Sequence, residues 1–161
     1  MLIEKVVVNS SPLIVLFRSG QENLFPKLFK NVVVPEQVYE EVTAKGAGDA
    51  ASESLPYASW VDRRQVPINL SVASWSLGYG ESAVLSFALS QVGYTAVIDD
   101  FAARRCAKIF GIRTIGTGGL LVLAKRRGLI SSVEAQVSRM RDNGLYLSNA
   151  IIKTLLSEAG E

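Results

Sequence analysis

The sequence predicts an α/β fold in which a parallel β-sheet is covered by helices on both faces. Short, β-branched apolar runs at residues 5–9, 32–34 and 95–99 have the composition of strands that are buried on both sides. Segments with apolar residues at helical spacing separate these runs. Strands that alternate with helices along a chain typically form a parallel sheet, so the pattern indicates this class.

The expected elements follow one another in a regular order. From the N-terminus they are a strand at 5–9, helices at 12–20 and 22–30, a strand at 32–34, a helix from 35, an edge strand at 60–66, a helix after 80, a strand at 95–99, a helix at 101–110, a strand at 112–115, and helices at 116–125, 131–142 and 148–158. Ser11 is expected to cap the first helix, because serine is a favoured N-cap and Pro12 suits the first helical position. The small, polar stretch 45–52 predicts a flexible connection.

The composition excludes several classes of protein. A chain of 161 residues suits a single domain, here 1–161, and no apolar run is long enough to span a bilayer. The N-terminus lacks the layout of a secretory signal, and the lone Cys106 fits a reducing cytoplasm. With no histidine, Ser-His and Cys-His catalysis and ordinary zinc sites are excluded. A net charge of +2 means that any nucleic-acid contact must come from local patches.

Oxygen-bearing side chains follow two of the buried strands. The run 95–98 stops at Asp99 and Asp100, and the run 5–8 stops at Asn9. Ligands of open α/β sheets gather beyond the carboxyl ends of the strands. In a chain with these residue types, a site at that edge would most naturally hold a hard cation.

Five motifs in a fixed order resemble one known superfamily. They are Asn9-Ser10-Ser11-Pro12-Leu13-Ile14, the stretch 34–42, Gly80-Glu81-Ser82-Ala83-Val84, Ile98-Asp99-Asp100 with Arg104-Arg105, and the stretch 111–121 with 124–130. In this order they resemble the PIN-domain superfamily, and more narrowly a PIN-like branch of the DUF3368 type, related to the toxin ribonucleases of type II toxin–antitoxin pairs. The resemblance covers about residues 5–145, and a helical segment of about 146–161 follows.

The resemblance implies a three-layer α/β/α sandwich with a central parallel sheet of four to five strands. It also implies a metal-dependent hydrolase that uses Mg²⁺ or Mn²⁺ to cut single-stranded RNA, leaving 5′-phosphate and 3′-hydroxyl ends. A small antitoxin-like partner and a homodimer are implied as well. By motif, the acidic positions fall on four places in this chain: Asn9, Glu41, Glu81, and Asp99 or Asp100. A hydroxyl near the metal would come from Ser11 or Thr117.

Each acidic residue also has a purely structural interpretation. Asp99 and Asp100 could cap the helix that follows them. Glu81 could complement the dipole of its helix, and Glu41 could be a solvated helix residue, although the spacing from the preceding proline selects it over Glu40.

The remaining candidates also allow two interpretations. Arg104 and Arg105 lie one turn beyond the acidic pair and could meet an RNA phosphate or a partner's carboxylate, or could simply be solvated. The glycine-rich stretch 116–119 could bind phosphate or be a tight turn. The aromatic residues Trp60, Trp75 and Tyr79 could stack a base, but packing is favoured.

Asn9 supplies an amide where the family usually has aspartate, and an amide brings no charge to a divalent ion. The sequence therefore leaves open a second function, a catalytically weakened PIN-like module that binds RNA or a protein partner. A third reading, an unrelated phosphotransfer or nucleotide-binding domain, lacks a Walker-type lysine motif.

Overall fold

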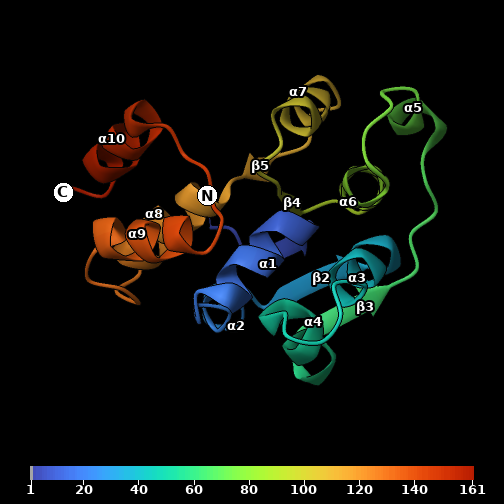
Figure 1. The fold of residues 1–161 in the computed structure, drawn as a ribbon. Coiled ribbons are helices and arrows are strands. Elements are labelled where there is room, and N and C mark those ends of the chain that lie inside the picture. The colour runs from blue at the N-terminus through green and yellow to red at the C-terminus, as the bar shows by residue number, and fades with distance from the viewer. Residues whose placement is uncertain (1) are drawn as a thin grey trace.

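One parallel sheet forms the centre of the protein in the computed structural model, which describes residues 2–161. Its strand order is β3-β2-β1-β4-β5 (Figure 1). The strands are β1 (Lys5–Val8), β2 (Asn31–Pro35), β3 (Val61–Arg64), β4 (Tyr94–Val97) and β5 (Thr114–Ile115). All pairings are parallel. The predicted parallel sheet, with its edge strand within 60–66, is confirmed.

Helices connect every pair of consecutive strands. In chain order they are α1 (Ser10–Arg18), α2 (Leu24–Leu28), α3 (Glu36–Thr43), α4 (Ala50–Ser54), the 3₁₀ turn η1 (Leu55–Tyr57), α5 (Leu70–Ala73), α6 (Tyr79–Ser90), α7 (Phe101–Ile109), α8 (Thr117–Arg126), α9 (Val133–Asp142) and α10 (Asn149–Glu158). The last three gather at one end of the molecule, away from α3 and α4 (Figure 1).

The strand order places helices on both faces of the sheet. The connections from β1 to β2 and from β2 to β3 run toward one edge, whereas those from β3 through β4 to β5 run toward the other. Because crossovers between parallel strands are right-handed, the two sets of helices cover opposite faces. The predicted three-layer α/β/α sandwich is confirmed.

The valine runs form the core because both sides of the central strands are covered. Val6, Val7 and Val8 of β1 are fully buried, as are Val33 and Val34 of β2. Strands in the middle of a doubly covered sheet have no polar face, which explains why these runs do not alternate with polar residues.

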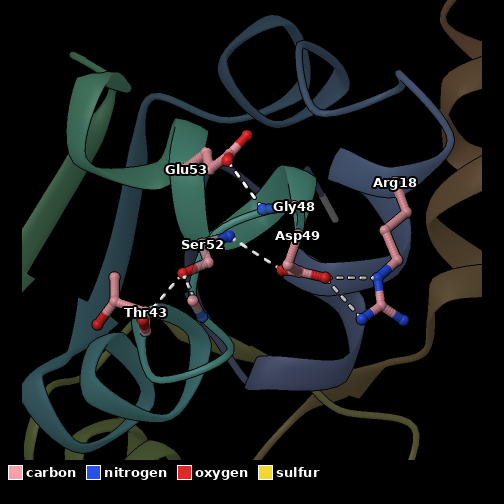
Figure 2. A network of polar contacts seen from close by, with 7 residues as sticks. Arg18, Thr43, Gly48, Asp49, Ser52 and Glu53 are labelled. Carbon is pink, nitrogen blue, oxygen red and sulfur yellow. Dashed lines mark hydrogen bonds and ion pairs between the residues drawn. The ribbon is translucent and has the colours of Figure 1, made fainter.

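Two local expectations are wrong. Residues 50–52 do not lie in a flexible connection but in α4, because Asp49 accepts a hydrogen bond from the Ser52 backbone N–H at 3.0 Å and pairs with Arg18 of α1 (Figure 2). Ser11 does not cap α1 either. That helix begins at Ser10, and Asn9 holds the N-cap position in an extended conformation without a side-chain capping bond.

The C-terminal residue ties the last helices together. The Glu161 carboxylate accepts hydrogen bonds from the Val133 backbone N–H at 2.6 Å and from the Lys125 Nζ at 2.9 Å. These contacts join the end of α10 to the start of α9 and to α8. Leu155 of α10 lies against Gly118 in the first turn of α8, where an added Cβ would come within 2.5 Å of it. The C-terminal helices are thus docked on the element that follows β5.

Candidate active site

The candidate site lies where the order of the strands reverses. β1 and β4 are neighbours, with Val8 opposite Val97, and the chain leaves them toward opposite edges of the sheet. The Asn9 backbone N–H donates to the Val97 carbonyl at 3.1 Å, so the residues that follow the two strands stay side by side. A reversal of this kind is where α/β sheets typically bind ligands.

Asn9 is a buried polar side chain at this edge. Its exposed fraction is only 3%, and its Nδ2 donates to Glu81 Oε1 at 3.4 Å. Its Oδ1 is buried and has no hydrogen-bond partner among the described residues. A buried acceptor without a partner costs about 1–3 kcal/mol, so this oxygen is available to a ligand that can satisfy it.

Glu41 of α3 is held at the N-terminus of α6. Its Oε1 accepts from the Gly80 backbone N–H at 2.9 Å, and its Oε2 accepts from the Ser10 hydroxyl at 2.5 Å. The contact needs a glycine, because a Cβ at position 80 would lie 2.7 Å from Glu41 Oε2. Gly78 serves Glu81 in the same way, since an added Cβ would collide with that carboxylate. The Gly-x-Gly-Glu pattern thus makes room for two carboxylates.

Asp99 is fixed by the start of α8. Its Oδ1 accepts from the Thr117 backbone N–H at 2.7 Å and its Oδ2 from the Thr117 hydroxyl at 2.5 Å. Thr117 is fully buried. A Cβ added to Gly116 would lie 3.0 Å from Asp99 Oδ1 and 2.8 Å from Arg104 Nη1, so both side chains converge on this glycine.

Other predicted residues lie apart from these contacts. Asp100 is exposed and caps α7, where its Oδ2 accepts from the Ala103 backbone N–H at 2.9 Å. Ser11 is exposed, and the serine that contacts a site carboxylate is Ser10. The Arg105 guanidinium lies 5.9 Å from the centre of the Phe101 ring.

The aromatic residues are divided between packing and exposure. Trp60 stacks on Phe17 and Phe25, with ring centres 6.1 and 5.5 Å apart, and Trp75 is packed against the core. Tyr79 is exposed at the first residue of α6. Packing therefore accounts for both tryptophans.

Comparison with known families settles the relationship of the chain. A family model, DUF3368, described as a PIN domain, matches residues 5–161. The chain belongs to the PIN-domain family. No curated protein and no solved structure matches it. PIN domains are typically nucleases that use divalent metals, and they often occur in toxin–antitoxin systems. Over residues 2–161, none of the helices combines the length and the apolarity that crossing a membrane requires.

The residues Asn9, Glu41, Glu81 and Asp99 offer oxygen atoms to a metal ion. Among residues 2–161, no three acidic, histidine or cysteine side chains are already clustered closely enough to hold one. Each carboxylate is instead bonded to a donor of its own: Glu41 to Ser10 and Gly80, Glu81 to Asn9, and Asp99 to Thr117. The donor chemistry nevertheless fits Mg²⁺ or Mn²⁺, because the buried Asn9 Oδ1 has no partner among the described residues and the Glu81 carboxylate contacts the same amide.

Sequence reasoning missed the supporting residues rather than the acidic ones. The roles of Ser10, Gly78 and Gly116 depend on contacts between elements far apart in the chain. A signal was present in the repeated glycines Gly78 and Gly80, because glycine is unfavourable inside a helix and Gly80 stands in the first turn of α6. Space for a neighbouring carboxylate explains them here.

Proposed function

We propose that this PIN domain is a metal-dependent endoribonuclease that cuts single-stranded RNA, and that it acts as the toxin or a toxin-like component of a toxin–antitoxin pair. The observation that carries the proposal is the buried, unpartnered Oδ1 of Asn9 beside Glu81, at the reversal of strand order. Glu41 and Asp99 approach the same edge from α3 and from the end of β4.

The ion would be held by Asn9, Glu81 and Asp99, with Glu41 next to them. A bound Mg²⁺ or Mn²⁺ would supply positive charge that neutralises phosphate oxygens and favours ionisation of a water. The chain's own part is positioning: the Thr117 hydroxyl orients Asp99, and the Ser10 hydroxyl and Gly80 N–H orient Glu41. Carboxylates that are fixed beforehand need not be reorganised during reaction.

Adjacent acidic residues provide matched controls for an activity test. Purified protein is incubated with single-stranded RNA and Mg²⁺ or Mn²⁺, and the ends of the products are mapped. We expect Glu41→Gln to lower the cleavage rate about 10- to 100-fold, as is typical when residues around a metal site are replaced. Glu40→Gln, at the neighbouring exposed position, should leave the cleavage rate unchanged. Products with 5′-phosphate and 3′-hydroxyl ends exclude contamination by metal-independent ribonucleases.

The same assay separates the two adjacent aspartates. Asp99→Asn should remove activity, whereas Asp100→Asn should retain most of it, because asparagine also caps helices well. Equal losses in both variants would mean that Asp100 is a ligand as well as a cap. Wild-type cleavage no faster than that of Asp99→Asn would refute the enzyme proposal.

A second candidate function rests on Asn9 itself. An amide at this position leaves the site one negative charge short, which favours a weakened module that binds RNA or a protein partner. Asn9→Asp discriminates between the two. If wild type is inactive and Asn9→Asp cuts RNA when metal is added, the weakened module is supported. Strong cleavage by wild type would exclude it.

Family membership also supports a proposal about partners. We expect a homodimer and a small antitoxin-like protein that masks the acidic site. Light scattering on the purified chain tests the first, and inhibition of cleavage by a co-expressed small protein tests the second.

A further inference from the structure

The outward face of α7 carries exposed side chains of two kinds, apolar and basic. Positions one, four, five, eight and nine of the helix share this face, as residues spaced by three and four do in any α-helix. They are Phe101, Arg104, Arg105, Lys108 and Ile109. Phe101 is 75% exposed and Ile109 68% exposed. Together with Ile112 and Thr114 these side chains line one shallow groove.

The positive charges of this face are not neutralised. Within residues 2–161, the side chains of Arg104, Arg105 and Lys108 form no hydrogen bond or ion pair, and the Arg105 guanidinium lies over the Phe101 ring. Other arginines are paired, such as Arg63 with Glu36. No acidic residue lines the groove. Three free cations on one helix face are suited to an anionic ligand.

The basic face begins at the candidate active site. Arg104 and Asp99 both approach the same glycine, Gly116. Arg105 and Lys108 continue away from it along α7, and the face from Phe101 to Ile109 is about 12 Å long at 1.5 Å per residue. A chain held at the acidic edge could therefore continue directly onto this helix.

We propose that the outward face of α7 binds the single-stranded RNA that flanks the cleavage site, with Arg105 and Lys108 on its phosphates and Phe101 stacked on a base. This inference rests on the proposed ribonuclease function. Proteins that bind single strands combine a positive track for the backbone with aromatic rings for the bases. The α7 face has both, whereas a duplex would present no free base to Phe101.

The test measures RNA binding without cleavage. The full chain is titrated against a short fluorescein-labelled oligouridine in EDTA, over a series of salt concentrations. Phe101→Ala should weaken binding roughly tenfold, the usual effect of one stacked base, and Phe101→Tyr should restore it. R105A/K108A should reduce the slope of log affinity against log salt by about 1.4, for two lost phosphate contacts.

A matched pair of cations controls for net charge. R141A/K153A removes two exposed charges, one from α9 and one from α10. The side chains of Arg141 and Lys153 have no polar partner in the part of the chain that the structure describes. This double variant should therefore bind the RNA with the affinity and the salt slope of wild type. The proposal fails if wild type does not bind the RNA, or if the α7 variants bind it like this control. It fails too if the α7 changes weaken the binding of an RNA duplex to the same extent. It also fails if the α7 changes alter only self-association, which would make the face a protein interface.

The experiments distinguish failure of this inference from failure of the ribonuclease proposal. Binding through α7 by a protein that cuts no RNA refutes only the enzyme function. Cleavage by wild type, combined with wild-type binding in the α7 variants, refutes only the role of α7.

Discussion

Gly80→Ala should damage the candidate site without damaging the fold. Gly80 lies in the first turn of α6, so alanine is compatible with its backbone and stabilises a helix by up to about 1 kcal/mol. The added Cβ would lie 2.7 Å from Glu41 Oε2, about 0.7 Å short of ordinary van der Waals contact. The carboxylate must therefore move away from the position in which Gly80 and Ser10 hold it.

The displacement should appear in metal binding and not in stability. We expect the thermal midpoint of Gly80→Ala to equal or exceed that of wild type, while Mn²⁺ affinity, measured by calorimetry, falls 10- to 100-fold, as is typical for residues that support metal ligands. Glu41→Asp provides the control, because its shorter side chain withdraws the carboxylate. If both changes act through the same carboxylate, the double variant should lose much less than the sum of the single losses. Two results would show that Gly80 does not act through Glu41. One is a Mn²⁺ affinity of Gly80→Ala equal to that of wild type, and the other is fully additive losses of Mn²⁺ affinity in the double variant.

Three further predictions concern ionisable groups outside the site. Burial opposes ionisation of Asp49, yet hydrogen bonds from the Ser52 N–H and the Arg18 guanidinium hold the pKa of its carboxyl below the ordinary value. In urea denaturation, Asp49→Ala should therefore cost about 1–2 kcal/mol at neutral pH, and the cost should shrink as acid protonates the carboxyl. The Val133 backbone N–H and then Lys125 lower the pKa of Glu161 from 4.5 to about 2, so wild type should exceed Glu161→Gln in stability at neutral pH and lose that advantage as the pH falls toward 2; a difference independent of pH would contradict this. Burial raises the pKa of the Cys106 thiol, so a disulfide reagent at pH 8 should modify it only after denaturant is added, and rapid labelling of the native protein would count against the buried position.

The sheet could be predicted because its strands have a distinctive composition. Runs such as Val6-Val7-Val8 and Val32-Val33-Val34 leave no polar face, and only a strand covered on both sides tolerates that. The start of α4 was missed although Asp49 is a favoured N-cap residue, because the stretch 45–52 is small and polar and the support from Arg18, 31 residues earlier, cannot be seen in the sequence. The short segments η1 and α5 have too few residues to show a periodic pattern.

The candidate site was partly predictable, because two of its residues directly follow buried strands. Asn9 and Asp99 follow buried strands, so the parallel topology alone brings them to one edge. Adjacent residues share almost the same sequence signal, however. The choice between Asp99 and Asp100 is made by the direction of each side chain, toward Thr117 in one case and toward the first turn of α7 in the other. Ser10 and Ser11 differ in the same way.

We propose that this PIN domain holds a divalent ion at the reversal of strand order, beside Asn9. A crystal structure of wild type soaked in Mn²⁺, with anomalous diffraction to locate the ion, tests it most directly. We expect an anomalous peak in contact with Asn9 Oδ1, Glu81 and Asp99, with Asp100 still capping α7. A peak elsewhere, or none at a Mn²⁺ concentration that supports cleavage, would contradict it.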